Sequence, residues 1–254
     1  MLDYSNKEVV VTGGGSGIGR AASLAFARQK ATVHLIDLQQ EMADAVVREI
    51  GAAGGKAYAY ACDVSVQAAV HQVFEKIGKV DVLLNNAGIA HIGKAHTTAE
   101  EDFDRLYAVN VKGVYNCMHA AIPGMQQQGG GVILNMGSIA AHSGLSDRFA
   151  YSMSKGAVNA MTLSVAKDYL NDHIRCNCIS PARVHTPFVD GFLAEHYPGR
   201  EKEMFDLLSE AQPIGRMGTP EEIADLILFL CADEASFITG CDYPIDGGYL
   251  TLKT

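Results

Sequence analysis

The feature that most constrains the fold is a regular alternation of short apolar runs with amphipathic helical patterns along the whole chain. The apolar runs lie at 8–13, 32–38, 56–64, 80–88, 131–138, 174–181 and 241–248. Strands separated by segments of helix length pair in parallel, as βαβ units in one open sheet that helices cover on both faces. The sequence therefore predicts a doubly wound α/β domain with a central parallel sheet of about seven strands.

One segment breaks this rhythm, PFVDGFLAEHYPGREKEMFDLLSEAQPIGRMG at 187–218. It is charged, it contains helical stretches, and it is bounded by Pro187 and by Pro213 and Gly218. Because the chain has no Pro- or Ser-rich linker and no repeat, we expect residues 1–254 to form a single domain. We interpret 187–218 as an excursion over the edge of the sheet that acts as a substrate lid, as long insertions often do.

Composition excludes several classes of protein. The formal net charge is −9 and no run of Lys and Arg occurs, so a nucleic-acid partner is not expected. No stretch approaches the roughly 20 apolar residues of a membrane helix, so no membrane association is expected. The N-terminus MLDYSNKEVV has neither a basic start nor an apolar core, which argues against an export signal.

The cysteines and histidines favour a cytoplasmic protein without a metal. Cys176 and Cys178 form a C-x-C pair in a predicted strand, where both thiols would lie on one face, and the other four cysteines occur singly in apolar segments. We interpret all six as reduced thiols, the usual state in the cytoplasm. The nine histidines show no H-E-x-x-H or C-x-x-C spacing, so no metal site is predicted.

A glycine cluster, VTGGGSGIGR at 11–20, joins the first predicted strand to the first helix. Gly13 would allow a sharp turn, Gly17 would let a pyrophosphate approach the backbone, and Gly19 would let the helix pack closely on the strand. The N-terminus of that helix would offer free N–H groups to the anion. A flexible loop is the alternative, but the position between strand and helix favours dinucleotide binding.

Asp37 ends the second predicted strand, which follows the helix that starts at the glycine cluster. A carboxylate there can accept hydrogen bonds from both ribose hydroxyls of an adenosine. The alternative is a capping residue for the following helix. A 2′-phosphate would meet a like charge, and Leu38 supplies no compensating cation, so we predict NAD and not NADP.

Three further residues suggest chemistry. Tyr151 and Lys155 in YSMSK are separated by one helical turn, so a helix would place them on one face, where an ammonium favours the phenolate form of tyrosine. The alternative is an exposed tyrosine over a lysine stem. Ser138 precedes this pair and follows a predicted strand, where open α/β sheets bind ligands, although it could equally be a turn serine.

These motifs, taken together, resemble the short-chain dehydrogenase/reductase family. The order and spacing match in TGGGSGIG (12–19), DV (63–64), NNAG (85–88), AVNVKG around Asn110, NMGS, YSMSK, SPARVHTP (180–187) and ITGCDYPIDGG (238–248). The resemblance covers nearly the whole chain and implies a single Rossmann domain. One departure is Ala182, where the family usually has glycine, and we expect its methyl group to be tolerated near the nicotinamide.

The resemblance implies four catalytic residues. Tyr151 would be the general acid/base, Lys155 its activator and a ligand of the nicotinamide ribose, and Ser138 the group that holds the substrate oxygen. Asn110 would hold a water that links Lys155 to solvent, or it could be a polar helix residue that satisfies a backbone group.

The resemblance also implies a set of NAD-binding residues: Gly13, Ser16, Gly17, Ile18, Gly19, Asp37, Asp63, Val64, Asn86, Ala87, Gly88, Tyr151, Lys155, Val184 and Thr186. Asp63 would meet the adenine through its carboxylate and Val64 through its backbone. Asn86 to Gly88 would run beneath the adenosine ribose. The Val184 backbone and the Thr186 hydroxyl would meet the carboxamide of the nicotinamide.

Arg148 lies just before Tyr151 and could bind a substrate carboxylate in a bidentate pair, assisted by Arg183. The alternative is a surface arginine paired with Asp147 or with the lid. With the anchor and the base this close together, we expect a short hydroxy acid and not a long apolar alcohol.

Three segments resemble those of family members that act on 2-keto-3-deoxy-L-fuconate or 3-hydroxybutyrate. They lie around YSMSK, at 174–188 and at 215–240. We predict oxidation of the C4 hydroxyl of 2-keto-3-deoxy-L-fuconate in carbohydrate metabolism. Oxidation of 3-hydroxybutyrate, or of a neutral sugar or polyol, is the alternative. A non-catalytic dinucleotide-binding regulator would usually lack Tyr151 or Lys155. The resemblance also implies a homotetramer built on the helices at 101–125 and 151–170 and on the C-terminal strand.

Overall fold

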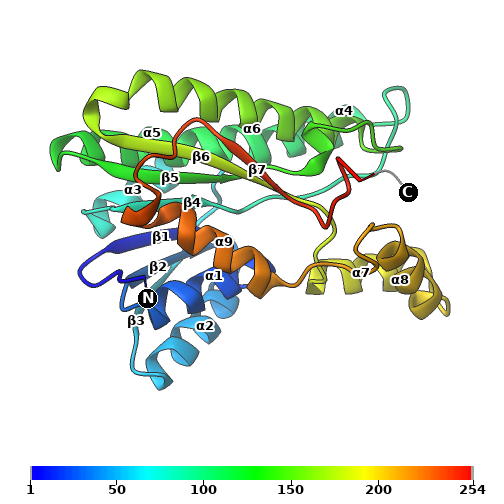
Figure 1. Ribbon diagram of the computed structural model, residues 1–254, viewed down its shortest axis with the longest axis horizontal. Coiled ribbons are helices and arrows are strands. Elements are labelled where there is room, and N and C mark those ends of the chain that lie inside the picture. Colours follow the sequence, from blue (N-terminus) through cyan, green and yellow to red (C-terminus); the bar gives the residue numbers. More distant parts are fainter. Residues whose placement is uncertain (1, 253–254) are drawn as a thin grey trace.

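A computed structural model describes residues 2–252 of the chain, and their centre is a seven-stranded parallel sheet (Figure 1). The strand order is β3-β2-β1-β4-β5-β6-β7, and every neighbouring pair is parallel. The strands are β1 (Glu8–Thr12), β2 (Thr32–Asp37), β3 (Lys56–Ala61), β4 (Val82–Asn85), β5 (Gly131–Met136), β6 (Ile174–Pro181) and β7 (Asp242–Ile245). The predicted doubly wound α/β domain is confirmed, and the order reverses between β1 and β4.

Helices cover both faces of this sheet (Figure 1). They are α1 (Gly17–Arg28), α2 (Gln40–Ala52), α3 (Gln67–Ile77), α4 (Glu100–Leu106), α5 (Gly113–Gln127), α6 (Phe149–Asp168), α7 (Pro187–His196), α8 (Glu201–Glu210) and α9 (Pro220–Cys231). Short 3-10 turns occur at η2 (Ile139–Ala141), η3 (Leu170–Asp172) and η4 (Asp233–Ala235), and a π-helical segment, η1, spans Tyr107–Lys112. The α1, α2 and α9 helices pack on one face, and α3, α5 and α6 pack on the other.

The core therefore has two apolar layers with the sheet between them. In β1, Val9 and Val11 face the layer of α1 and α9, while Val10 faces the layer of α3 and α5, and all three are fully buried. This explains why the strand reads as a continuous apolar run and not as an alternating one. Cys176 and Cys178 in β6 face the same layer, as their spacing predicts, and all six cysteines are free thiols.

The helix predicted across 101–125 is confirmed as a helical stretch from Glu100 to Gln127, but its middle differs from a regular α-helix. Between α4 and α5 the six residues of η1 adopt π geometry. Apolar periodicity cannot reveal such a segment, because a single wider turn shifts the helix face without breaking the pattern. Asn110 lies inside this segment.

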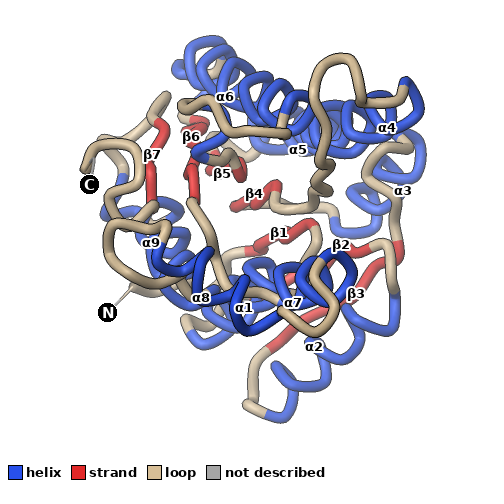
Figure 2. Tube along the Cα trace, turned by 90° about the vertical axis from the view of Figure 1, so that its right-hand side faces the viewer, coloured by secondary structure: helices blue, strands red, loops and turns tan. Residues whose placement is uncertain are grey.

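The segment 187–218 leaves the sheet at its carboxyl end and carries α7 and α8, which extend away from the main body (Figure 1) and point towards the viewer in Figure 2. Both ends of the segment are tied together, since Gly218 N–H donates to Arg183 O and His185 N–H donates to Gly218 O, each at 2.9 Å. Across residues 2–252, no helix has the length and apolar character needed to cross a bilayer.

Candidate active site

A cleft of 430 Å³ opens at the carboxyl ends of the strands, where the strand order reverses. Open parallel sheets bind their ligands at this position. The cleft brings together most of the predicted site residues, namely Gly13, Ser16, Gly17, Ile18, Asn86, Ala87, Gly88, Ser138, Arg148, Tyr151, Lys155, Arg183, Val184 and Thr186. Most of the predicted cofactor and catalytic residues therefore share one cleft with both candidate substrate arginines.

Five predicted residues do not line the cleft itself: Gly19, Asp37, Asp63, Val64 and Asn110. Asp37 still borders the glycine turn, because its Oδ2 accepts a hydrogen bond from the Gly15 N–H at 2.9 Å. Its Oδ1 accepts from the Gln39 N–H, so the carboxylate turns the chain before α2 without capping that helix directly. Asp63 is exposed and accepts from the Ser65 N–H at 2.9 Å.

The glycine turn shows why side chains are excluded from it. Gly17 has φ +49°, and a Cβ there would lie 3.3 Å from Thr186 across the cleft. At Gly19, a Cβ would lie 2.0 Å from the Gly13 carbonyl oxygen. This distance is far shorter than van der Waals contact, so any side chain there would clash with the backbone. The Ser16 side chain makes no capping bond to α1. The free N–H groups of α1 and an open backbone therefore face the cleft, as a pyrophosphate requires.

Thr12 and Asn86 hold this turn in place, and sequence reasoning missed the first of them. The Thr12 Oγ1 accepts from the N–H groups of Asn86 and Ala87, both at 3.0 Å. The Asn86 Nδ2 donates to the carbonyl oxygens of Thr12 and Gly13 at 3.0 and 3.1 Å. A threonine that ends an apolar run was the only signal, because the sequence does not show that the end of β4 lies beside β1.

Tyr151 and Lys155 occupy one face of α6, as predicted. The Lys155 Nζ lies 5.8 Å from the centroid of the Tyr151 ring and donates to Met136 O at 2.7 Å. The lysine is only 6% exposed, so its charge acts in a medium that screens it less than water does.

Ser138 follows β5 and is also buried. Its Oγ accepts from the Ala140 N–H at 3.1 Å, which caps η2 and leaves the hydroxyl hydrogen free to donate. Ser138 is therefore a turn residue, because it caps η2, and it also lines the cleft.

The Asn110 side chain is fully occupied by protein groups. Its Oδ1 accepts from the Ile89 N–H, and its Nδ2 donates to Ile89 O, both at 2.8 Å. The Nδ2 also donates to the Ser154 Oγ at 3.1 Å, and Ser154 in turn donates to Tyr151 O at 2.8 Å. Both hydrogens of the amide group are therefore used by protein groups, as the alternative interpretation expects. Sequence reasoning missed Ser154, although it lies within YSMSK.

Arg148 and Arg183 both line the cleft, and among residues 2–252 neither forms an ion pair. Asp147 pairs with Lys94 at 3.9 Å instead, which removes one alternative for Arg148. Arg148 makes only a long contact, 3.4 Å from Nη1 to His91 O. Partial burial and the like charge of Arg148 lower the pKa of the Arg183 guanidinium. Two cations without a carboxylate partner favour an anionic ligand.

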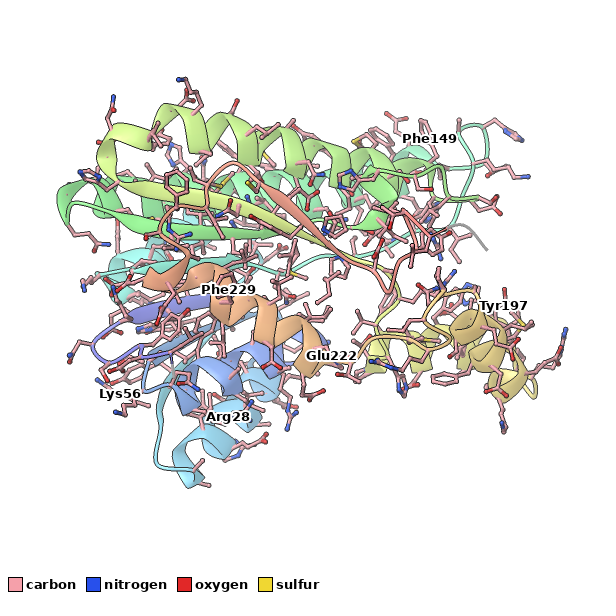
Figure 3. All side chains as sticks on the ribbon, viewed as in Figure 1. Arg28, Lys56, Phe149, Tyr197, Glu222 and Phe229 are labelled. Atoms are coloured by element: carbon pink, nitrogen blue, oxygen red, sulfur yellow. The ribbon has the colours of Figure 1, made fainter. Side chains whose placement is uncertain are left out.

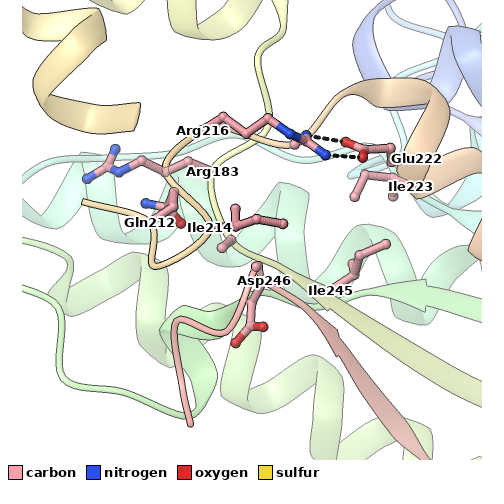
Figure 4. A pocket seen from close by; sticks show the side chains of 11 residues that line it. Arg183, Gln212, Ile214, Arg216, Glu222, Ile223, Ile245 and Asp246 are labelled. Atoms are coloured by element: carbon pink, nitrogen blue, oxygen red, sulfur yellow. Dashed lines mark hydrogen bonds and ion pairs between the residues drawn. The ribbon is translucent and has the colours of Figure 1, made fainter. Parts of the chain in front are cut away.

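A smaller cavity of 170 Å³ adjoins the cleft and shares Ala182 and Arg183 with it. Figure 4 shows Arg216 and Glu222 in a bidentate ion pair along its border, at 2.6 and 2.8 Å. This pair joins the end of the 187–218 segment to the first turn of α9. The hydrogen bonds from Arg216, and then from the Thr219 backbone, lower the pKa of Glu222 to about 2.

No metal centre accompanies these side chains. Within the described range 2–252, no three His, Cys, Asp or Glu side chains gather closely enough to hold an ion. The cleft offers hydroxyl, phenol, ammonium and guanidinium groups, which suit proton transfer and anion binding.

Comparison with known proteins agrees with this geometry. A family model described as enoyl-(acyl carrier protein) reductase matches residues 13–250. An uncharacterised oxidoreductase of Thermotoga maritima is 39% identical over 97% of this chain and 98% of its own length. The 2-keto-3-deoxy-L-fuconate dehydrogenase of Xanthomonas campestris is 36% identical over 96% of this chain and 80% of its own length.

A solved structure also matches the fold closely. The L-sorbose reductase of Gluconobacter frateurii, in complex with NADPH and L-sorbose, superimposes with a TM-score of 0.94 at 29% identity. The match covers 99% of each chain.

Proposed function

The chain belongs to the short-chain dehydrogenase/reductase family of oxidoreductases that use a nicotinamide dinucleotide, and we propose that it oxidises a secondary hydroxyl of a small hydroxy acid with NAD⁺. The observation that carries this proposal is the pair Arg148 and Arg183, which line the same cleft as Ser138 and Tyr151 without a carboxylate partner in the described chain. Our candidate substrate is 2-keto-3-deoxy-L-fuconate, oxidised at its C4 hydroxyl. The similarity to the Xanthomonas dehydrogenase named for this compound supports it.

In this proposal, four residues of the chain prepare the substrate. The Ser138 hydroxyl donates a hydrogen bond to the carbinol oxygen, and Tyr151 removes the proton from that oxygen as a general base. The buried Lys155 ammonium provides a positive charge beside the tyrosinate that this step requires. Asn110 holds the first turn of α6 through Ser154. The bound dinucleotide supplies the hydride acceptor, and the glycine turn, Val184 and Thr186 would hold it.

The preference for NAD rests on Asp37. Its carboxylate lies against the Gly15 N–H, at the edge of the turn that would hold the pyrophosphate. A 2′-phosphate there would approach a negative charge, and the neighbouring Leu38 is exposed and uncharged. The NADPH complex of the sorbose reductase shows that this fold also accepts the phosphorylated cofactor, so the choice depends on local charge.

A neutral sugar or polyol is the second candidate substrate, favoured by the similarity to L-sorbose reductase. It would leave Arg148 and Arg183 without an anionic partner, and we therefore rank it below a hydroxy acid, among which 3-hydroxybutyrate is the smaller option. A regulator that only binds the dinucleotide would not need Ser138, Tyr151 and Lys155 together in one cleft.

We also propose that 187–218 is a lid over the substrate. Its first residues, Pro187, Phe188 and Val189, already line the cleft, and its tied ends leave α7 and α8 free to move as a unit. We propose in addition that the protein is a homotetramer and that it is located in the cytoplasm.

The test replaces Arg148 with Met and measures NADH formation against a panel of short hydroxy acids and neutral sugars. Loss of a charge-assisted bond should raise KM for the acid roughly 10- to 100-fold, while KM for NAD⁺ changes less than about twofold. Arg28→Met is the matched control, because Arg28 is exposed at the end of α1, far from the cleft (Figure 3). An unchanged KM for the acid, or a preference for the neutral sugars, would refute the carboxylate anchor.

A further inference from the structure

A polar cluster packs directly against Gly137, the residue before Ser138. Within this cluster, Asp242 Oδ2 accepts hydrogen bonds from Asn159 Nδ2 at 2.7 Å and from Ser180 Oγ at 2.8 Å, and it also pairs with His142 Nε2. A Cβ on Gly137 would lie 2.7 Å from Ser180 Oγ and 3.1 Å from Asn159 Oδ1. The cluster therefore leaves no space behind the Ser138 turn.

The three donors come from three different elements that meet at this carboxylate. His142 ends the η2 turn that Ser138 caps, and Asn159 lies one helical turn beyond Lys155 in α6. Ser180 lies near the end of β6, and Asp242 begins β7. One carboxylate oxygen thus joins the turn that carries Ser138 to the helix that carries Tyr151 and Lys155.

The Ser138 turn can transmit this constraint because it is internally bonded. The Ser138 Oγ accepts from the Ala140 N–H at 3.1 Å, the Ala141 N–H donates to Ser138 O at 2.9 Å, and the His142 N–H donates to Ile139 O at 3.0 Å. Fixing His142 at one end therefore fixes Ser138 at the other. Because Ser138 and Tyr151 must address the same substrate oxygen, a shift of about 1 Å can cost roughly 100-fold in rate.

The carboxylate is suited to this role by its burial. The Asp242 side chain is 18% exposed, so its bonds to the three donors are screened less than surface bonds are. Its other oxygen, Oδ1, is buried and has no hydrogen-bond partner in the described chain. All of the polar contacts of the carboxylate are therefore concentrated on Oδ2.

We propose that Asp242 is a positioning residue of the active site, which holds Ser138 at a fixed distance from Tyr151 through His142 and Asn159. This inference rests on the proposed catalytic roles of Ser138 and Tyr151. Asp242 itself contacts neither residue, so its effect on the reaction passes through the η2 turn and α6.

The experiment is a double-mutant cycle in the full chain with Asp242→Ala, Ser138→Ala and the double variant. Asp242→Ala should lower kcat roughly 10- to 100-fold and leave the dissociation constant of NAD⁺ within about twofold. In the Ser138→Ala background, the same change should lower kcat by less than about twofold, because the residue it positions is already absent. Asp242→Asn keeps one acceptor oxygen for the three donors and should restore part of kcat.

The matched control is Asp81→Ala. Asp81 is also largely buried, at 13% exposure, accepts from the Glu8 N–H at 2.8 Å and pairs with Lys79, but it lies at the amino end of the sheet. Its loss should lower the melting temperature and leave kcat unchanged. Additive losses of Asp242 and Ser138, or an unchanged kcat in Asp242→Ala, would overturn the positioning role. An unchanged kcat in Ser138→Ala alone would instead contradict the proposed function.

Discussion

Asp37 illustrates how one side chain can stabilise the fold and, in the function proposed above, also select the cofactor. It accepts hydrogen bonds from two backbone N–H groups, of Gly15 and Gln39, and so connects the end of β2 to the glycine turn. The same negative charge disfavours a 2′-phosphate at that edge. The proposed preference for NAD therefore comes from the charge of Asp37, and the same carboxylate also bonds to the glycine turn.

We predict that the wild type has a kcat/KM for NAD⁺ at least about 100-fold above that for NADP⁺, and that Asp37→Asn reduces this ratio by at least about tenfold. The asparagine keeps an acceptor oxygen for the Gly15 N–H but loses the charge that repels the phosphate. Steady-state rates with both cofactors measure the ratio, with Asp225→Asn on α9 as an exposed control. A wild type that prefers NADP⁺ would refute the assignment of Asp37.

At the scale of residues, sequence reasoning located most of the side chains that line the cleft but not the residues that hold them in place. Ser138 could be predicted because it follows a strand. Tyr151 and Lys155 could be predicted because their spacing is one helical turn. Thr12 and Ser154 could not, because their hydrogen-bond partners lie on other elements that are distant along the chain. The pairing of β1 with β4 brings the partners of Thr12 to it, and the packing of α6 against η1 brings Asn110 to Ser154.

At the scale of elements, Gly, Pro and capping residues fix several boundaries in the structure. The α9 helix begins after Thr219 with a complete capping box, in which Thr219 Oγ1 accepts from the Glu222 N–H and the Glu222 carboxylate accepts from the Thr219 N–H. The π segment η1 carries no such marker, and Pro187 and Gly218 do not reveal that the two ends of the 187–218 segment are hydrogen-bonded to each other. Both depend on contacts between distant elements.

The low pKa of Glu222, about 2, predicts a specific dependence of stability on pH. A carboxyl whose pKa is lowered on folding stabilises the folded state above its unfolded pKa of about 4.5, and this contribution is lost as the pH falls from 4.5 towards 2. Glu222→Gln keeps the capping box but loses the ion pair with Arg216. Its melting temperature should therefore lie below that of the wild type at pH 7, and the difference should shrink through this window.

Thermal unfolding at a series of pH values measures this difference. The Glu222 side chain is 43% exposed on the border of its cavity, so solvent screens its ion pair with Arg216 and the shift should be no more than a few degrees. Glu221→Gln is the control, since Glu221 is exposed on the same helical turn. A constant difference between Glu222→Gln and the wild type from pH 7 to pH 2 would contradict the assignment.

At the scale of the whole molecule, the alternation of strands and helices was sufficient to predict the layers of the fold. It was not sufficient to predict how copies of the chain assemble, because exposed apolar side chains are also common in monomers. Leu163 on α6 and Phe149 at its start are largely exposed, as is Phe229 on α9 (Figure 3). Two of these positions, Leu163 and Phe149, lie on a helix that the family resemblance implicates in assembly.

We predict a tetramer, with a mass in solution four times the 27.1 kDa of one chain. Light scattering coupled to size-exclusion chromatography measures this mass directly. Leu163→Glu should reduce it, because the carboxylate would have to be buried in an apolar contact. Leu38→Glu is the control, since Leu38 is exposed beside the proposed cofactor site. A wild-type mass of one chain would refute the tetramer.

In the proposed function, Tyr151, supported by Lys155, performs the proton transfer in this cleft. The value of kcat for Tyr151→Phe tests this role directly. The assay uses whichever hydroxy acid the wild type oxidises fastest, with NADH affinity measured in parallel. Tyr58→Phe on β3 is the control for loss of an exposed phenol. We predict a loss of roughly 100- to 10,000-fold in kcat, with NADH affinity within about twofold of the wild type. A Tyr151→Phe variant that turns over at the rate of the wild type would contradict the account.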